Sequence, residues 1–395
     1  MPFAVGSLLL PLFGIAPFFD LQAGHLILAL FLAFEWGVLT GMGLFYDAAF
    51  HNLRVPTWRI SHLYSYGIAL RWGALLLIII SLVYAANILC HVLAAPSVAD
   101  YFLGKRARAL AGGGVSATNP FIYRAINFSM AHLLLCATWR YFSRGTVVMP
   151  MRMLFFALLI ASGLTSLLEG NRSTLIVVLI ALMCFIYVYY LVSTKIIIFS
   201  GMAFMIFFIL SMQIFRLGGD FSLEGLGLAF RWFVVYAFGS LVSFSDFINQ
   251  HILTFWYAFD IGAGKFGARF AEAVGARDFF IIDYVRIGDL STNVYSGYAV
   301  LYDYLGGWAA LFITLKSAAF YCLKWLGRRS FIGAACYIAL LASYPLTIYH
   351  EFSLTALYYC LVILEWAAVL WLWTCFIRML IGVRARVPLN TEIRG

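Results

Sequence analysis

The chain has 395 residues, of which 64% are hydrophobic and only 11% are charged, whereas about a quarter of the residues in a soluble domain are charged. This composition excludes a set of separate water-soluble domains and indicates one membrane domain that covers residues 1–395. The formal net charge of +9 comes from Lys and Arg residues scattered between apolar segments, so no nucleic-acid partner is expected.

Ten apolar segments predict an all-α fold, a polytopic bundle of transmembrane helices. A helix needs about 20 apolar residues to cross the roughly 30 Å hydrocarbon layer, because its backbone polar groups must be satisfied internally there. In chain order the segments are residues 3–19, 24–46, 72–95, 121–139, 152–168, 173–192, 196–215, 297–320, 330–349 and 353–378. The first segment has no preceding basic region, so we expect it to be a retained span and not a cleaved signal peptide.

The distribution of Lys and Arg among the short loops predicts the orientation, because basic loops remain in the cytoplasm. Ten alternating spans place both termini and four basic segments on the cytoplasmic side, and these segments are 54–71, 140–152, 324–329 and 378–394. The other side then carries the turn 169–172, residues 349–351, the long segment 216–296 and the basic residues Lys105, Arg106 and Arg108. Basic residues on that side are unexpected, and they indicate either an anion site or a misplaced span.

The long segment 216–296 carries eight of the 17 acidic residues of the chain and six of its 26 Lys and Arg residues. Aromatic residues recur through it, which suits helices that lie in, or dip into, the outer interface of the membrane. A re-entrant pair between residues 228 and 260 keeps the number of spans at ten, whereas two ordinary spans there would raise it to twelve. We expect part of an active site to lie in this periplasmic segment.

Charged side chains close to a membrane are costly to place and are therefore candidates for function. The first group is the turn 169–172, where Arg172 can hold an anion bidentately, although a surface pair with Glu169 explains the turn as well. The second group is residues 216–220, at the exit of the seventh predicted span. Its alternative explanation is that Arg216 snorkels to the interface.

A third group of polar residues runs from 283 to 307, immediately before and inside a predicted span. Its members are too dense to be incidental, and they include Asp283, Arg286, Asp289, Asn293, Tyr295, Tyr302 and Asp303. A fourth group, residues 349–351, offers His350 as a proton acceptor, although a polar turn between two helices explains it equally. Within the spans we expect Glu35 and Glu365 to be neutral or paired inside the bundle.

The sequence contains no motif of a soluble enzyme. It has no H-E-x-x-H, no G-x-S-x-G, no Walker loop and no dinucleotide fingerprint. A D-x-D motif is also missing, which disfavours a cytoplasmic sugar-nucleotide transferase. We therefore expect neither a metal ion nor another cofactor.

Three stretches of the chain resemble the Wzy-type oligosaccharide repeat-unit polymerases, the O-antigen polymerase family. Asn-Val-Tyr-Ser at 293–296, Tyr-Asp-Tyr at 302–304 and Gly-Gly at 306–307 are similar to the N-V-Y-T, D-F-G and glycine run that precedes a late span in that family. Gly-Asn-Arg-Ser at 170–173 is similar to its G-S-R turn, and residues 230–247 are similar to its aromatic outer-face stretch. The departures are mild, with Asn171 in place of serine, Ser296 in place of threonine and Tyr304 in place of phenylalanine.

The resemblance implies a GT-C-like membrane fold in the bacterial inner membrane, with an active site that faces the periplasm. It implies a metal-independent, inverting glycosyltransferase that moves a growing glycan from undecaprenyl diphosphate onto a new lipid-linked repeat unit. The implied partners are these undecaprenyl-diphosphate-linked glycans, the membrane lipids and a chain-length regulator protein.

The same resemblance implies a role for each candidate residue. The departing diphosphate would be neutralised by Arg172, Arg216 and Arg286. The residues eligible as the base are Asp289, Asp283, Glu169, His350 and Glu351. The remaining candidates would bind the sugars and the second lipid, and they are Asn293, Tyr295, Tyr302, Asp303, Arg231, Arg124, Lys105 and Arg106.

Two other activities remain open. An O-antigen ligase would use the same donor but transfer the glycan to lipid A core. A lipid-linked oligosaccharide flippase, or another transporter, would line a path with intramembrane charges. The chain has no internal repeat, and its charge is concentrated in one outer segment, which favours an enzyme over a transporter.

Overall fold

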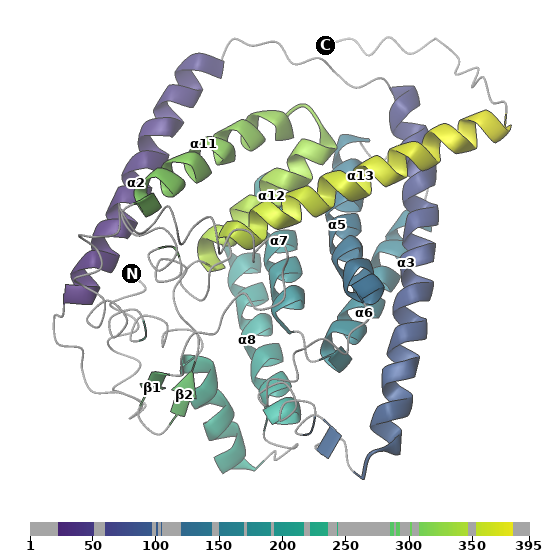
Figure 1. The fold of residues 1–395 in the computed structure, drawn as a ribbon. Helices are drawn as coiled ribbons and strands as arrows, with labels where there is room; N and C mark the ends of the chain where they lie inside the picture. Colours follow the sequence, from purple (N-terminus) through teal and green to yellow (C-terminus); the bar gives the residue numbers. More distant parts are fainter. Residues whose placement is uncertain are drawn as a thin grey trace.

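The chain forms a bundle of helices, with α2 and α3 on its two flanks in the view of Figure 1. The computed structural model describes residues 23–50, 60–96, 100–101, 104, 120–143, 150–169, 172–190, 193–216, 222–235, 243, 285–287, 290–292, 301, 308–346 and 353–381. The predicted first span, residues 3–19, lies outside them. The helices labelled in Figure 1 are α2 (Ala23–Phe50), α3 (Ile60–Ala94), α5 (Pro120–Phe142), α6 (Pro150–Glu169), α7 (Arg172–Tyr190), α8 (Thr194–Arg216), α11 (Ala309–Gly327), α12 (Phe331–Leu346) and α13 (Ser353–Ile381).

Each predicted span from residue 24 onward corresponds to one of these helices, with two corrections of length. α3 begins at Ile60 and not near residue 72, because the helix continues through polar residues beyond the apolar stretch. α11 begins at Ala309 and not near residue 297, and two glycines, which are poor helix formers, precede its N-cap residue Trp308. Among the described residues, α2, α3, α6, α11 and α13 are long and apolar enough to cross a membrane. The chain is thus a helical membrane protein.

The helix α5 lies at the centre of the bundle, where it packs against α3, α6, α7, α12 and α13. Residues 131–139 are buried without interruption. This helix is also rich in polar residues, and it satisfies two of them locally: Ser129 donates to the Ala125 carbonyl (2.9 Å) and Thr138 to the Leu134 carbonyl (2.8 Å). A polar helix is best placed where other helices cover it, because lipid offers its side chains no hydrogen bonds.

Two glycines of α3 allow that helix to approach α5 closely. A Cβ atom at Gly67 would lie 2.5 Å from Cζ2 of Trp139, and one at Gly73 would lie 2.9 Å from Cε1 of His132. Small residues at such positions let membrane helices pack closely, because no hydrophobic force drives them together within lipid. The contact between α3 and α5 therefore depends on these two positions.

The helix ends that carry the predicted basic segments meet at one end of the bundle. Tyr66 of α3 contacts Phe331 at the start of α12, with ring centroids 5.0 Å apart. Tyr141, near the end of α5, contacts Tyr189 of α7 at 4.8 Å, and the Tyr189 hydroxyl donates to the Gly327 carbonyl (3.4 Å). Three predicted basic segments therefore share this end, as expected; they are 54–71, 140–152 and 324–329. The fourth, 378–394, lies largely outside the described residues.

We define this basic end by Arg140, Lys324, Arg328 and Arg329, and aromatic rings contact the last three of these cations. Nζ of Lys324 lies 5.2 Å from the ring centroid of Tyr46 and 5.4 Å from that of Tyr321. The Arg329 guanidinium lies 3.5 Å from the Trp325 ring centroid. Cations and aromatic rings at the end of membrane helices are typical of a membrane–water interface.

The helix α2 runs parallel to α11 and is joined to it by polar contacts. Nζ of Lys316 lies 2.5 Å from Oε1 of Glu35 and 4.3 Å from the Tyr344 ring centroid. Further along the pair, the Tyr321 hydroxyl donates to the Leu39 carbonyl (2.8 Å). The expectation that Glu35 is paired inside the bundle is confirmed.

A first prediction concerns the tight turn between α11 and α12. A Cβ atom at Gly333 would lie 2.7 Å from the carbonyl carbon of Leu326 and 2.8 Å from its oxygen, and backbone atoms cannot give way as a flexible side chain can. Gly333→Ala is therefore expected to cost about 1–3 kcal/mol of stability. Gly37→Ala is the control, because nothing lies within 4 Å of a Cβ there and alanine is the better helix former. Thermal unfolding in detergent should show a lower midpoint for the first variant only.

Candidate functional site

The helices α6, α7 and α8 bring three sequence-predicted residues to one end of the bundle. α6 ends at Glu169 and α7 begins at Arg172. Only residues 191–193 separate α7 from α8, and the two helices contact each other, so the chain reverses between them. α8 ends at Arg216 and has 23 residues, four more than α7.

This second end lies opposite the basic end, because α7 runs from Arg172 at one to Tyr189 at the other. We call it the site end and define it by Glu169, Arg172 and Arg216. The structure describes the backbone positions of these three residues but not their side chains. What converges at the site end is therefore the ends of the three helices.

A further helix, residues 223–235, follows α8 after six residues. Ser222 caps its start, since the Ser222 hydroxyl accepts a hydrogen bond from the Gly225 backbone N–H (3.0 Å). Six residues span at most about 20 Å, so this helix begins near the site end. It carries Arg231, which is half-buried, and its residues Ala229, Val234 and Val235 are buried.

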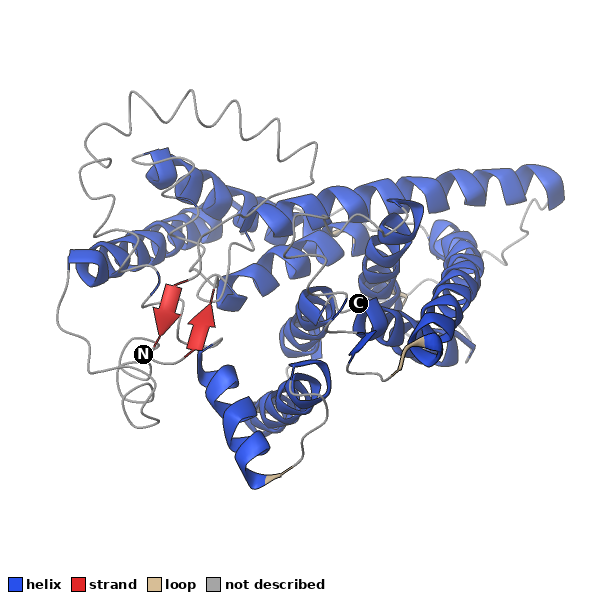
Figure 2. Cartoon of the chain, turned by 60° about the horizontal axis from the view of Figure 1, so that its bottom comes forward, coloured by secondary structure: helices blue, strands red, loops and turns tan. Residues whose placement is uncertain are grey.

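A small antiparallel hairpin carries Arg286. Its strands are β1 (Val285–Ile287) and β2 (Leu290–Thr292), and Arg286 lies opposite Ser291. Figures 1 and 2 both show the hairpin beside the helix 223–235. The described part of the chain is thus helical, as expected, apart from this one pair of three-residue strands. Two residues, Gly-Asp, separate the strands, and a glycine-containing two-residue loop between short β-forming runs is a recognisable hairpin signal.

Four arginines thus lie on elements that meet at or follow the site end: Arg172, Arg216, Arg231 and Arg286. Guanidinium groups bind phosphate oxygens bidentately and remain charged at any physiological pH. A set of arginines at one end of a membrane bundle can neutralise a phosphorylated head group there. Glu169 is the one carboxylate at the three helix ends that define the site end.

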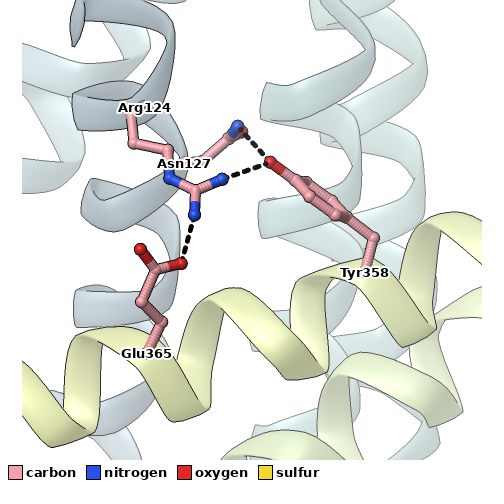
Figure 3. A network of polar contacts seen from close by, with 4 residues as sticks. All are labelled: Arg124, Asn127, Tyr358 and Glu365. Atoms are coloured by element: carbon pink, nitrogen blue, oxygen red, sulfur yellow. Dashed lines mark hydrogen bonds and ion pairs between the residues drawn. The ribbon is translucent and has the colours of Figure 1, made fainter. Parts of the chain in front are cut away.

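A second polar cluster joins α5 and α13, and its side chains are described (Figure 3). Arg124 forms an ion pair with Glu365 through Nη2, and its Nη1 donates to the Tyr358 hydroxyl (3.2 Å). Nδ2 of Asn127 donates to the same hydroxyl (3.4 Å). Glu365 is paired, as expected, but its side chain is 43% exposed and does not lie inside the bundle. Arg124 therefore already has an anionic partner within the protein.

Aromatic contacts continue this cluster toward the centre of the bundle. The Arg124 guanidinium lies 5.6 Å from the Phe128 ring centroid, and Phe128 stacks on Trp366 at 4.8 Å. Nε1 of Trp366 donates to Nδ1 of His132 (2.8 Å). A neutral His132 with its proton on Nε2 fits this arrangement, which makes it a packing residue, as its fully buried position also indicates.

Local sequence patterns did not single out Asn127 or Tyr358. Helical spacing could have suggested them: Arg124 and Asn127 are three residues apart on α5, and Tyr358 and Glu365 are seven apart on α13, so each pair shares a helix face. Several predicted site residues lie outside the described part of the chain, namely Lys105, Arg106, Asp289, Asn293, Tyr295, Tyr302, Asp303 and His350. Among the residues that the structure does describe, no three His, Cys, Asp or Glu side chains gather as metal ligands.

Comparison of the chain with protein-family models, curated proteins and solved structures finds no match. The site must therefore be interpreted from its own residues.

Proposed function

We propose that the chain crosses the bacterial inner membrane ten times, with the basic end in the cytoplasm and the site end facing the periplasm. One observation supports the membrane location and a second supports the orientation. Five described helices are long and apolar enough to span a bilayer. The basic end collects three of the four basic segments, and such segments remain in the cytoplasm.

We propose that the site end polymerises oligosaccharide repeat units that are linked to undecaprenyl diphosphate. The observation that carries this proposal is the convergence of Glu169, Arg172 and Arg216 at one end of α6, α7 and α8. The helix that carries Arg231 follows α8 in the chain, and the hairpin that carries Arg286 lies beside this helix. Arginines that converge at a membrane surface suit a substrate whose leaving group is a lipid diphosphate.

In this reaction the growing glycan is the donor and a single lipid-linked repeat unit is the acceptor. The acceptor hydroxyl attacks the anomeric carbon with inversion, the bond from that carbon to the diphosphate oxygen breaks, and undecaprenyl diphosphate leaves. The hydroxyl proton passes to a base, for which the candidates are Asp289, Asp283, Glu169, His350 and Glu351. The guanidinium groups of Arg172, Arg216 and Arg286 stabilise the charge that develops on the departing diphosphate.

The remaining candidates bind the substrates. Lys105, Arg106 and Arg124 hold the diphosphate of the acceptor lipid, and Arg231 contributes positive charge between the two lipids. The sugars are bound by the motif residues Asn293, Tyr295, Tyr302 and Asp303, since tyrosine rings stack on sugar faces. A chain-length regulator in the same membrane limits the product.

A transporter for lipid-linked glycans is the second candidate. The ion pair between Glu35 and Lys316 favours it, because charges within a membrane often line a transport path. That pair is sealed between α2 and α11, however, with side chains 5% and 0% exposed. A path for a sugar would need these charges to face water.

The test is a reaction with purified wild-type protein in proteoliposomes and undecaprenyl-diphosphate-linked repeat units of the source strain. Products are separated by mass, and translocation is followed with a lectin outside the vesicles. Extension to two or more repeat units supports the polymerase. Transfer to added lipid A core alone identifies a ligase, and translocation without a new bond identifies a transporter; either result overturns the polymerase.

A further inference from the structure

The cluster around Arg124 differs from the ion pair of Lys316 with Glu35. The side chains of Arg124 and Glu365 are each 43% exposed, whereas those of Lys316 and Glu35 are 0% and 5% exposed. A sealed pair cannot exchange its partner without separating two helices. A half-exposed pair can, because an incoming anion reaches the guanidinium directly.

We propose that Arg124, Tyr358 and Asn127 form a binding site for a phosphate group carried by a lipid, and that Glu365 occupies this site as an internal anion until the ligand displaces it. The identity of the ligand as a polyprenyl diphosphate rests on the proposed function. The competition by Glu365 rests on the geometry of the cluster.

The position of Arg124 suits a lipid phosphate. Arg124 is the fifth residue of α5, so it lies about 6 Å along the helix from Pro120. The other end of α5, with Tyr141, belongs to the basic end. Arg124 therefore lies about one turn from the end of α5 that is opposite the basic end, and its partner Glu365 is the thirteenth residue of the 29-residue helix α13.

The surroundings of Glu365 indicate from which side the ligand arrives. Leu361 and Leu364 lie one turn and one residue before Glu365 on α13, and both are exposed. Exposed leucines on a membrane helix face lipid chains. A ligand that reaches Arg124 past these leucines must combine a phosphate with an apolar chain.

The cluster already has the hydrogen-bond donors that a phosphate needs. Arg124 and Asn127 both donate to the Tyr358 oxygen, which leaves the Tyr358 hydroxyl proton available for an anion. The Phe128 ring supports the guanidinium from the side and is itself stacked on Trp366. These contacts hold the donors in place before a ligand binds, which reduces the entropy lost on binding.

The replacement of Glu365 distinguishes this site from a purely structural ion pair. If Glu365 competes with the ligand, Glu365→Gln should lower the dissociation constant about two- to fivefold. This factor corresponds to the free energy of a partly exposed ion pair. A structural role predicts the opposite sign, because loss of the pair would disorder Arg124. Arg124→Gln should weaken binding at least about tenfold, since charge-assisted hydrogen bonds to the phosphate are lost.

The experiment measures equilibrium binding to the full-length protein in detergent by native mass spectrometry. The probes are undecaprenyl diphosphate, phosphatidylglycerol and inorganic pyrophosphate. Glu224→Gln is the matched control, because Glu224 is exposed near the site end and its removal changes the net charge equally. Tyr358→Phe, a mild change, should weaken binding about twofold or more, and thermal unfolding confirms that each variant is folded.

Tighter binding of undecaprenyl diphosphate to Glu365→Gln alone supports the proposal. Unchanged or weaker binding to this variant, or an equal gain in Glu224→Gln, overturns it. Equal affinity for phosphatidylglycerol or for pyrophosphate overturns the assignment to a polyprenyl diphosphate. The binding experiment does not measure glycosyl transfer, so the two proposals can fail separately. Tighter binding to Glu365→Gln with no glycan extension by the wild type would support the binding site and contradict the polymerase. Glycan extension without tighter binding to Glu365→Gln would support the polymerase and contradict the binding site.

Discussion

Replacement of Lys316 by methionine is expected to lower the free energy of unfolding by about 3–5 kcal/mol, because the Glu35 carboxylate would remain buried without its cation. The two charged groups lie 2.5 Å apart, and their side chains are 0% and 5% exposed. The Lys316 amine also lies over the Tyr344 ring, so its removal eliminates this cation–π contact as well. Unfolding by heat or by sodium dodecyl sulfate, starting from purified protein in detergent, measures the loss.

The double variant Glu35→Gln with Lys316→Met should recover most of this loss, because it removes both desolvated charges together. Lys324→Met is the control. Lys324 is half-buried and contacts the rings of Tyr46 and Tyr321 at the basic end, so its loss should cost no more than about 1 kcal/mol. If the losses in unfolding free energy caused by the two substitutions simply add in the double variant, Glu35 and Lys316 do not act as a pair.

Each of the variants Arg172→Ala, Arg216→Ala and Arg286→Ala is expected to lower the rate of glycan extension by about a hundred- to a thousandfold. Removing one preorganised donor to a developing negative charge has an effect of this size in other enzymes. The corresponding lysine variants should retain part of the rate, because lysine keeps the charge but loses the bidentate fork. The measurement is extension of purified lipid-linked repeat units at saturating substrate.

Arg328→Ala is the matched control for these variants. Arg328 is an exposed arginine at the basic end, where its guanidinium lies 5.6 Å from the Tyr46 ring centroid. Its removal should change the rate less than about twofold, because a charge that is far from the reaction contributes little. Normal extension by all three variants, Arg172→Ala, Arg216→Ala and Arg286→Ala, would refute the role that we assign to their guanidinium groups.

The positions of the helices could be predicted from the sequence because a membrane places one dominant requirement on the backbone. Apolar runs of sufficient length must form helices there, and the helices from α2 to α13 match the predicted spans closely. The predictions are wrong for segments outside the apolar runs, where the membrane does not require a helix. Residues 60–71 extend α3 although they are too polar for the apolar criterion, and the hairpin β1–β2 lies outside any apolar run.

The candidate residues at the site end could be found from local charge patterns, and chain reversal alone places Arg172 and Arg216 at the same end. The partners of buried charges could not be found in this way. Glu365 pairs with Arg124 across 241 residues of sequence, and the choice depends on α13 crossing α5. Tyr358 and Asn127 join them for the same reason.

The sequence by itself determined that this chain is a helical membrane protein, where most of its helices lie, and that Glu35 and Glu365 are either neutral or paired. These properties follow from hydrophobicity and charge, which act residue by residue. Only the tertiary structure decided that the polar helix α5 lies at the centre, that Lys316 is sealed and that Arg124 is open. Those properties depend on which helices pack together, and within lipid that choice is made by close packing at positions such as Gly67 and Gly73 and not by hydrophobicity.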